Sequence, residues 1–162
     1  VGIMLTGESG VGKSETALEL VKRGHRLVAD DVVEIRMMEE GKLVGSAPEI
    51  LRYLMEIRGL GIIDVRNMYG VGAVIHDKTI DIVMHFEEWE PDKPYERLGL
   101  QEETITLLDV KIPLIITPVM PGRNLSILAE VAAMNYRLKK IGYSTASELD
   151  RRMMDMSILQ KD

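Results

Sequence analysis

The chain has 162 residues, 46% of them hydrophobic and 28% charged, a balance that suits one globular domain and excludes disordered and fibrous architectures. Its 26 aspartates and glutamates outnumber its 20 lysines and arginines, and the net charge of −6 argues against nucleic-acid binding, which depends on neutralising phosphates. Its longest apolar runs span only a few residues, whereas a transmembrane helix needs about 20, so we expect no membrane-bound segment.

The start of the chain and its lack of cysteine bear on its origin. Residues 1–6 are already strand-like, with neither an initiator methionine nor a signal peptide before them, so we expect a fragment of a longer protein. Without cysteine there is no disulfide, thiol catalysis or thiolate metal site, which fits a cytoplasmic protein. No repeat, low-complexity tract or linker divides residues 1–162, which we expect to form one domain.

The first half of the chain combines strands and helices. In chain order we expect a buried strand at residues 1–6, a glycine-rich loop at 7–12, a helix at 13–23, a strand at 26–35 that Asp30 and Asp31 interrupt, and a hairpin turn at 39–42. Gly24 stands where the C-terminal cap of the first helix belongs. The sequence from Ser46 to Glu49 is a capping box, which predicts a helix that ends near Met55.

The second half is expected to hold further strands followed by two helices. In chain order these are a half-buried strand at 80–86, a loop at 91–94, an apolar strand at 112–119, a long helix begun by Asn124, and a final helix from about 146 to 160. The long helix carries an apolar series at helical spacing: Leu128, Val131, Leu138 and Ile141. The final helix has an apolar stripe of Leu149, Met153 and Met156, so we expect it to contact another subunit or a partner protein rather than only its own domain.

The segment after the first strand matches the phosphate-loop pattern G-x-x-x-x-G-K-[ST]. Its residues are Gly7, Glu8, Ser9, Gly10, Val11, Gly12, Lys13 and Ser14. The glycines let consecutive backbone N–H groups turn toward phosphate oxygens, and the next helix adds its positive N-terminus. Because Lys13 can reach the β- and γ-phosphates and the Ser14 hydroxyl can bind Mg²⁺, we expect a site for nucleotide phosphates.

Two adjacent carboxylates, Asp30 and Asp31, follow the apolar stretch 27–29, 17 and 18 positions after Lys13. A carboxylate at a strand end beside a phosphate loop can hold Mg²⁺ or its waters, or accept a proton from an attacking hydroxyl group. Neighbouring side chains of an extended chain point to opposite faces, so we expect the two aspartates to divide these tasks. The alternative is a solvated turn.

Other segments carry weaker signals. Residues 55–64 mix charge, glycine and apolar side chains without a clean period, which is typical of a functional loop feeding a strand or of a helix cap and turn. Arg97 and Arg123 would stabilise developing charge if they lay beside a transferring phosphoryl group, and a surface position is the alternative. The three histidines lack the spacing of metal ligands, so we expect no histidine metal site.

In their order along the chain, these segments resemble the catalytic domain of the HPr kinase/phosphorylase family. The likeness runs from Gly2 to about Ser144 and rests on residues 7–20, 26–31, 56–64, 97–99, 121–124 and 130–135, of which 56–64 is the most specific. It implies a P-loop-containing α/β fold, with a core similar to that of phosphoenolpyruvate carboxykinase, a mixed β-sheet and C-terminal helices. It also implies an N-terminal domain that is absent from residues 1–162.

The resemblance implies a bifunctional enzyme that uses ATP and Mg²⁺ to phosphorylate a serine of HPr, a phosphocarrier of the sugar phosphotransferase system. With inorganic phosphate the enzyme would remove this group and release pyrophosphate, and it would assemble as a homo-hexamer. The implied catalytic residues are Lys13, Asp30, Asp31, Glu56, Arg58, Arg97, Pro118, Val119, Met120, Pro121, Gly122 and Arg123. Asp31 would accept the serine proton and return it in the reverse reaction, and Ser14 and Glu56 would bind Mg²⁺.

Residues 118–123 would serve chiefly dephosphorylation, and the family pattern has a basic residue where Met120 stands. Two other functions stay open at this point. One is a carboxykinase-like kinase of small molecules, which would need a closed substrate pocket. The other is a catalytically silent regulator that binds nucleotide, against which the intact Lys13, Asp30, Asp31 and Glu56 argue.

Overall fold

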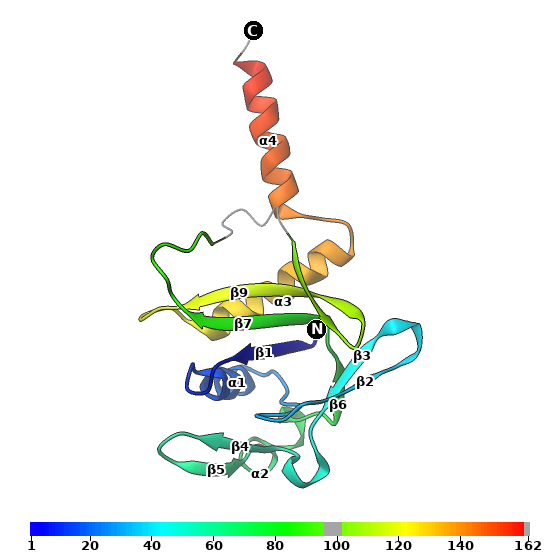
Figure 1. Ribbon diagram of the computed structural model, residues 1–162, viewed down its shortest axis with the longest axis vertical. Helices are drawn as coiled ribbons and strands as arrows, with labels where there is room; N and C mark the ends of the chain where they lie inside the picture. Colours follow the sequence, from blue (N-terminus) through cyan, green and yellow to red (C-terminus); the bar gives the residue numbers. More distant parts are fainter. Residues whose placement is uncertain (96–101, 161–162) are drawn as a thin grey trace.

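The computed structural model describes residues 1–95 and 102–160, and a mixed four-stranded sheet lies at its centre (Figure 1). The strands follow the order β1 (Ile3–Gly7), β7 (Ile82–Glu88), β9 (Val110–Val119) and β8 (Glu103–Leu107). β1 and β9 run parallel to β7, whereas β8 is antiparallel to β9. The strands predicted at 1–6 and 112–119 are confirmed with slightly shifted ends.

Two smaller sheets lie beside the central one. β2 (Glu34–Met37), β3 (Leu43–Ser46) and β6 (Asp77–Thr79) form an antiparallel sheet, and β4 (Leu54–Ile57) pairs with β5 (Gly61–Asp64) as a hairpin. The hairpin turn predicted at 39–42 is confirmed, because β2 and β3 are joined there by a short 3₁₀ turn, η1 (Glu39–Gly41).

The helices are α1 (Lys13–Lys22), α2 (Val65–Tyr69), α3 (Leu125–Lys140) and α4 (Thr145–Leu159), with two more 3₁₀ turns, η2 (Glu49–Leu51) and η3 (Val71–Ala73). The predicted cap of α3 is confirmed, because the Asn124 side chain accepts hydrogen bonds from the backbone N–H groups of Ser126 and Ile127 at 3.0 and 3.1 Å. Gly24, just after α1, has a φ of +98°, the conformation expected of a glycine that ends a helix.

The middle strand, β7, is buried on both faces. Val83 packs with Leu43 of the second sheet on one face, while Met84 and Phe86 pack with Ala129 of α3 on the other. The alternating sequence predicted a half-buried strand, which is wrong because a layer of the fold covers each face. β7 therefore anchors both β1 and β9, and with them the loops that follow these two strands.

Two predicted elements of the first half differ from the structure. The interruption predicted at Asp30 and Asp31 is confirmed, because the chain bends there, but the strand predicted at 26–35 is mostly absent: Leu27 makes one isolated bridge with Val74, and β2 begins only at Glu34. The helix predicted after Ser46 shrinks to η2, because Ser46 is buried in β3 and the chain soon enters β4. Long-range pairing outweighs local sequence signals in both places.

The buried face of α3 matches the predicted apolar series only in part. Leu128 packs against the core, but Val131 and Ile141 of the same series are 55% and 80% exposed, whereas Ser126 and Ala129 are buried. Small side chains on the buried face allow α3 to lie close to α1 and the central sheet, a preference that hydrophobic periodicity does not register.

α4 projects away from the rest of the domain (Figure 1), and none of its residues is buried. Its cap is Ser144, whose hydroxyl accepts a hydrogen bond from the backbone N–H of Ser147 at 3.3 Å, so the helix begins close to its predicted start. The stripe residues Met153 and Met156 are 58% and 60% exposed. Among the helices in the described part of the chain, none is both long and apolar enough to cross a bilayer.

Candidate active site

The phosphate loop connects the end of β1 to the start of α1. Gly7, Gly10 and Gly12 have φ values of +147°, +85° and +107°, which L side chains rarely adopt. A Cβ on Gly7 would lie 2.6 Å from the carbonyl oxygen of Phe86, and one on Gly10 would lie 2.7 Å from Nη2 of Arg58. The loop therefore needs glycine both for its backbone shape and for the close approach of its neighbours.

Lys13 lies across this loop. Its Nζ donates hydrogen bonds to the carbonyl oxygens of Gly7 and Glu8 at 2.7 and 3.0 Å. The side chain of Thr16 donates to the carbonyl oxygen of Gly12 at 2.7 Å and so fixes the loop to the first turn of α1. A lysine ammonium and the positive end of a ten-residue helix together make a site suited to an anion such as a phosphate.

Asp30 joins two segments that are far apart in the sequence. One oxygen of its carboxylate accepts a hydrogen bond from the Ser14 hydroxyl at 2.7 Å, and the other accepts one from the backbone N–H of Glu56 at 3.0 Å. These bonds hold the bend that interrupts the predicted strand. They also bring together the two residues expected to bind Mg²⁺, while the neighbouring Asp31 is exposed.

Residues 55–64 form most of the β4–β5 hairpin, which neither interpretation of the sequence predicted. Met55 faces the core and is 1% exposed, whereas Glu56 on the opposite face is exposed. Arg58, in the turn, places its guanidinium against Gly10, because a Cβ on that glycine would lie 2.7 to 3.3 Å from three guanidinium atoms. The hairpin is thus in contact with the phosphate loop through Arg58 and, through Asp30, with Ser14.

Residues 118–123 leave the sheet at the same edge as the phosphate loop. Gly7 at the end of β1 and Thr117 near the end of β9 both pair with Phe86, so the two parallel strands end at the same level. Pro118 and Val119 close β9, and the turn from Met120 to Arg123 follows, with Pro121 and Gly122 between them. Nη1 of Arg123 donates to the carbonyl oxygen of Pro118 at 3.3 Å. Arg97 lies outside the described residues.

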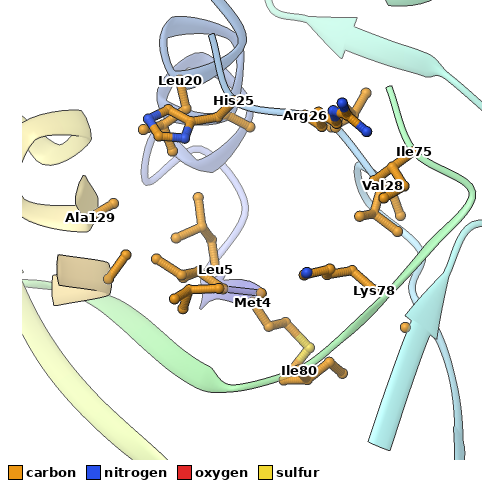
Figure 2. A pocket seen from close by; sticks show the side chains of 18 of the residues that line it. Met4, Leu5, Leu20, His25, Arg26, Val28, Ile75, Lys78, Ile80 and Ala129 are labelled. Atoms are coloured by element: carbon orange, nitrogen blue, oxygen red, sulfur yellow. The ribbon is translucent and has the colours of Figure 1, made fainter. Parts of the chain in front are cut away.

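A cavity of about 510 Å³ lies along β1 and reaches Lys13, Asp30 and Asp31. Figure 2 shows Lys78 extending into it, with Met4 and Leu5 beside it. Sequence reasoning missed Lys78, because the cavity forms between segments that are distant in the chain and no local motif marks it.

Glu130 of α3 ties this helix to the C-terminal end of α1. Nη2 of Arg23 and Nε2 of His25 hydrogen-bond to its carboxylate at 2.8 and 3.0 Å. The bonds from Arg23 and then His25 lower the pKa of Glu130 from 4.5 to about 2. This cluster is a structural link behind the phosphate loop, and spacing alone gave no sign of it.

A glycine-rich loop between a parallel strand and a helix, with lysine, serine and aspartate gathered at the carboxyl edge of the sheet, defines a nucleotide-binding α/β protein of the phosphate-loop class. Residues 1–153 match the model of the HPr Serine kinase C-terminal domain, and the chain belongs to that family. The predicted family and fold class are confirmed.

Named relatives agree with this assignment. The HPr kinase/phosphorylase of Caldanaerobacter subterraneus subsp. tengcongensis is 60% identical over 154 residues, covering 95% of this chain and 50% of the relative. That of Geobacillus thermodenitrificans is 57% identical over 155 residues, with 96% and 50% covered. The solved structure of the Hpr(Ser) kinase/phosphatase from Coxiella burnetii superposes with a TM-score of 0.79 at 35% identity, covering 91% of this chain and 89% of that one. The chain spans about half the length of the curated relatives it matches.

Proposed function

We propose that residues 1–162 form the catalytic domain of an ATP-dependent protein kinase that phosphorylates a serine of HPr, and that the same site removes the group with inorganic phosphate and releases pyrophosphate. The relatives named above carry both activities in their names. The observation that best supports the proposal is that Asp30 accepts hydrogen bonds from the Ser14 hydroxyl and the Glu56 backbone N–H beside the loop that Lys13 spans, because the residues proposed to bind phosphate and metal then lie together.

ATP would be held by the phosphate loop, with its terminal phosphates facing Lys13. The loop fits this role, since its glycines leave backbone N–H groups free of side chains and Lys13 already lies across it. Mg²⁺ would be bound by Ser14 and Glu56 and would neutralise phosphate charge. Among the described residues, no group of three or more acidic or histidine side chains is placed to hold a metal ion by itself.

The two aspartates would act in different ways. Asp30 uses both oxygens to position Ser14 and Glu56, so it holds the site together. Asp31 would accept the proton of the serine hydroxyl. At the same time the serine oxygen bonds to the γ-phosphorus of ATP, and the bond from that phosphorus to ADP breaks. In the reverse direction an oxygen of inorganic phosphate bonds to the phosphorus of phosphoserine, the bond to the serine oxygen breaks, and Asp31 returns the proton.

The reverse reaction would depend chiefly on residues 118–123. They leave the sheet level with the phosphate loop, where an additional phosphate has to be held, and Arg123 offers a guanidinium for this. Arg97 is proposed from the family resemblance alone to stabilise the transferring phosphoryl group. By the same resemblance we propose a cytoplasmic homo-hexamer.

The test is incubation of the protein with HPr, Mg²⁺ and ATP labelled on the γ-phosphate, followed by an excess of inorganic phosphate. We expect label on HPr in the first step and labelled pyrophosphate in the second. HPr with its acceptor serine replaced by alanine controls for the site, and Asp31→Asn should lose both steps while still binding ATP. Unlabelled HPr, with a folded protein that binds ATP, would reject the proposal.

A further inference from the structure

The β4–β5 hairpin has one buried and one exposed face. In its register Met55 pairs with Ile63 and Glu56 pairs with Ile62. Because neighbouring residues of a strand point to opposite faces and Met55 is buried, Ile62 shares the outer face with Glu56. Side chains directly opposite on an antiparallel pair have Cβ atoms about 5 Å apart, so Ile62 stands beside the candidate metal ligand.

Two large aliphatic side chains of this hairpin are exposed next to the site. Ile62 on β5 and Leu60 in the turn are each 73% exposed. Single exposed aliphatic residues are common on protein surfaces and need no explanation by themselves. These two are set apart by their place, because the same hairpin contacts the phosphate loop through Arg58 and is tied by the Glu56 backbone to Asp30.

We propose that Leu60 and Ile62 form a docking contact for the protein substrate, against apolar side chains that surround its acceptor serine. This inference rests on the proposed function. Phosphates gain nothing from aliphatic contacts, and the nucleotide phosphates already have the loop and Lys13. A serine on a folded protein, in contrast, reaches the phosphate loop only if the protein surface around that serine contacts the residues next to the loop. The β4–β5 hairpin lies next to the loop.

The test compares substitutions that remove apolar surface with one that keeps it. Ile62→Thr retains the β-branched shape that strands favour but adds a hydroxyl, Leu60→Ser removes the second side chain, and Ile62→Val is the conservative variant. Val131→Thr is the matched control, because Val131 is 55% exposed on α3, which Figure 1 places well away from the hairpin. The measurements are kcat, the KM values for HPr and for ATP, and the oligomeric state.

For Ile62→Thr and for Leu60→Ser we expect the KM for HPr to rise about fivefold to tenfold, the range of a moderate interface contact, with the KM for ATP unchanged. Ile62→Val and Val131→Thr should stay within about twofold of the wild type. An unchanged KM for HPr, or equal rises in both KM values, would overturn the inference.

A change of oligomeric state in Ile62→Thr would also overturn it, because the face would then be an interface between copies of the chain. If the wild-type protein itself leaves HPr unphosphorylated, the proposed function fails and the docking contact with it. That result is distinct, since it appears before any variant is compared.

Discussion

The phosphate loop and α4 are held in opposite ways. The loop is fixed by contacts that span the sequence: Asp30 reaches both Ser14 and Glu56, and Arg58 lies on Gly10. α4 has no buried residue, and its ion pairs join Glu148 to arginines one turn away in the same helix. The geometry of the loop is thus fixed by the rest of the domain, whereas the apolar side chains of α4 are exposed, and we predict that a partner buries them.

Replacing Lys13 by alanine should cause the largest loss of activity among these changes. We expect phosphoryl transfer to fall at least about 100-fold, as when a preorganised charge is removed from a transition state. The unfolding temperature should change little, because Lys13 contacts loop carbonyls rather than the core. Kinase assays and thermal unfolding measure the two quantities, and a well-folded Lys13→Ala protein with normal activity contradicts the phosphate-loop assignment.

Removing α4 should weaken binding to a partner and leave nucleotide binding at the phosphate loop unchanged. A protein that ends at Tyr143 loses Leu149, Met153 and Met156. We therefore expect weaker assembly of the subunits or a KM for HPr that is several-fold higher, which corresponds to a loss of about 1 kcal/mol of binding free energy. The affinity for ATP should stay the same. Mass measurement in solution and kinetics with HPr are the readouts. A truncated protein with the same oligomeric state and the same KM for HPr would show that α4 has only a structural role.

Met120→Arg should increase dephosphorylation relative to phosphorylation. The turn from Met120 to Arg123 follows β9 at the level of the phosphate loop, and an added guanidinium there can hold a further phosphate. We expect the rate of dephosphorylation to rise a few-fold relative to that of phosphorylation. The measurement is the ratio of the dephosphorylation rate to the phosphorylation rate in the wild type and in the variant. The same ratio in both proteins would contradict a role for position 120.

Lowering the pH should destabilise the two regions in different ways. Glu130 and Glu148 each have a pKa lowered from 4.5 to about 2, the first mainly by Arg23 and the second mainly by Arg151. Their contributions to stability are therefore complete above pH 4.5 and lost as the pH falls toward 2.

The consequences of this loss should differ between the two carboxylates. Protonation of Glu130 removes a link between α1 and α3 and lowers the unfolding temperature of the domain, whereas protonation of Glu148 only frays α4. Glu130→Gln should flatten the pH dependence of the unfolding temperature, and Glu148→Gln should flatten only that of helix content. Identical pH profiles for wild type and Glu130→Gln would contradict the link.

The sequence was most informative where the chemistry is local. The phosphate loop from Gly7 to Ser14, the cap at Asn124 and the stop at Gly24 depend on neighbouring residues, and the structure has all three. It was least informative where distant segments decide. The sequence of residues 26–35 predicted a strand with an interruption at Asp30, but it did not show that Leu27 would pair only with Val74 or that Asp30 would bind Ser14 and Glu56.

Packing was a second limit on prediction from sequence. The cap-like sequence at Ser46 gives way to the burial of that residue in β3. On α3, small residues such as Ala129 face the core in place of the larger Val131, since the space between two layers, and not hydrophobicity, sets which face is inside. The likeness of 56–64 to the family pointed to this segment, although its hairpin shape came only from the structure.

The most direct test of the account follows the phosphorus atom. Serine-phosphorylated HPr, Mg²⁺ and inorganic phosphate are mixed with the protein, and phosphorus NMR counts phosphoserine, phosphate and pyrophosphate over time. If one site transfers the phosphoryl group in both directions, each phosphoserine lost yields one pyrophosphate, and Asp31→Asn abolishes the conversion. Loss of phosphoserine with release of free phosphate and no pyrophosphate would mean transfer to water, and would contradict the account.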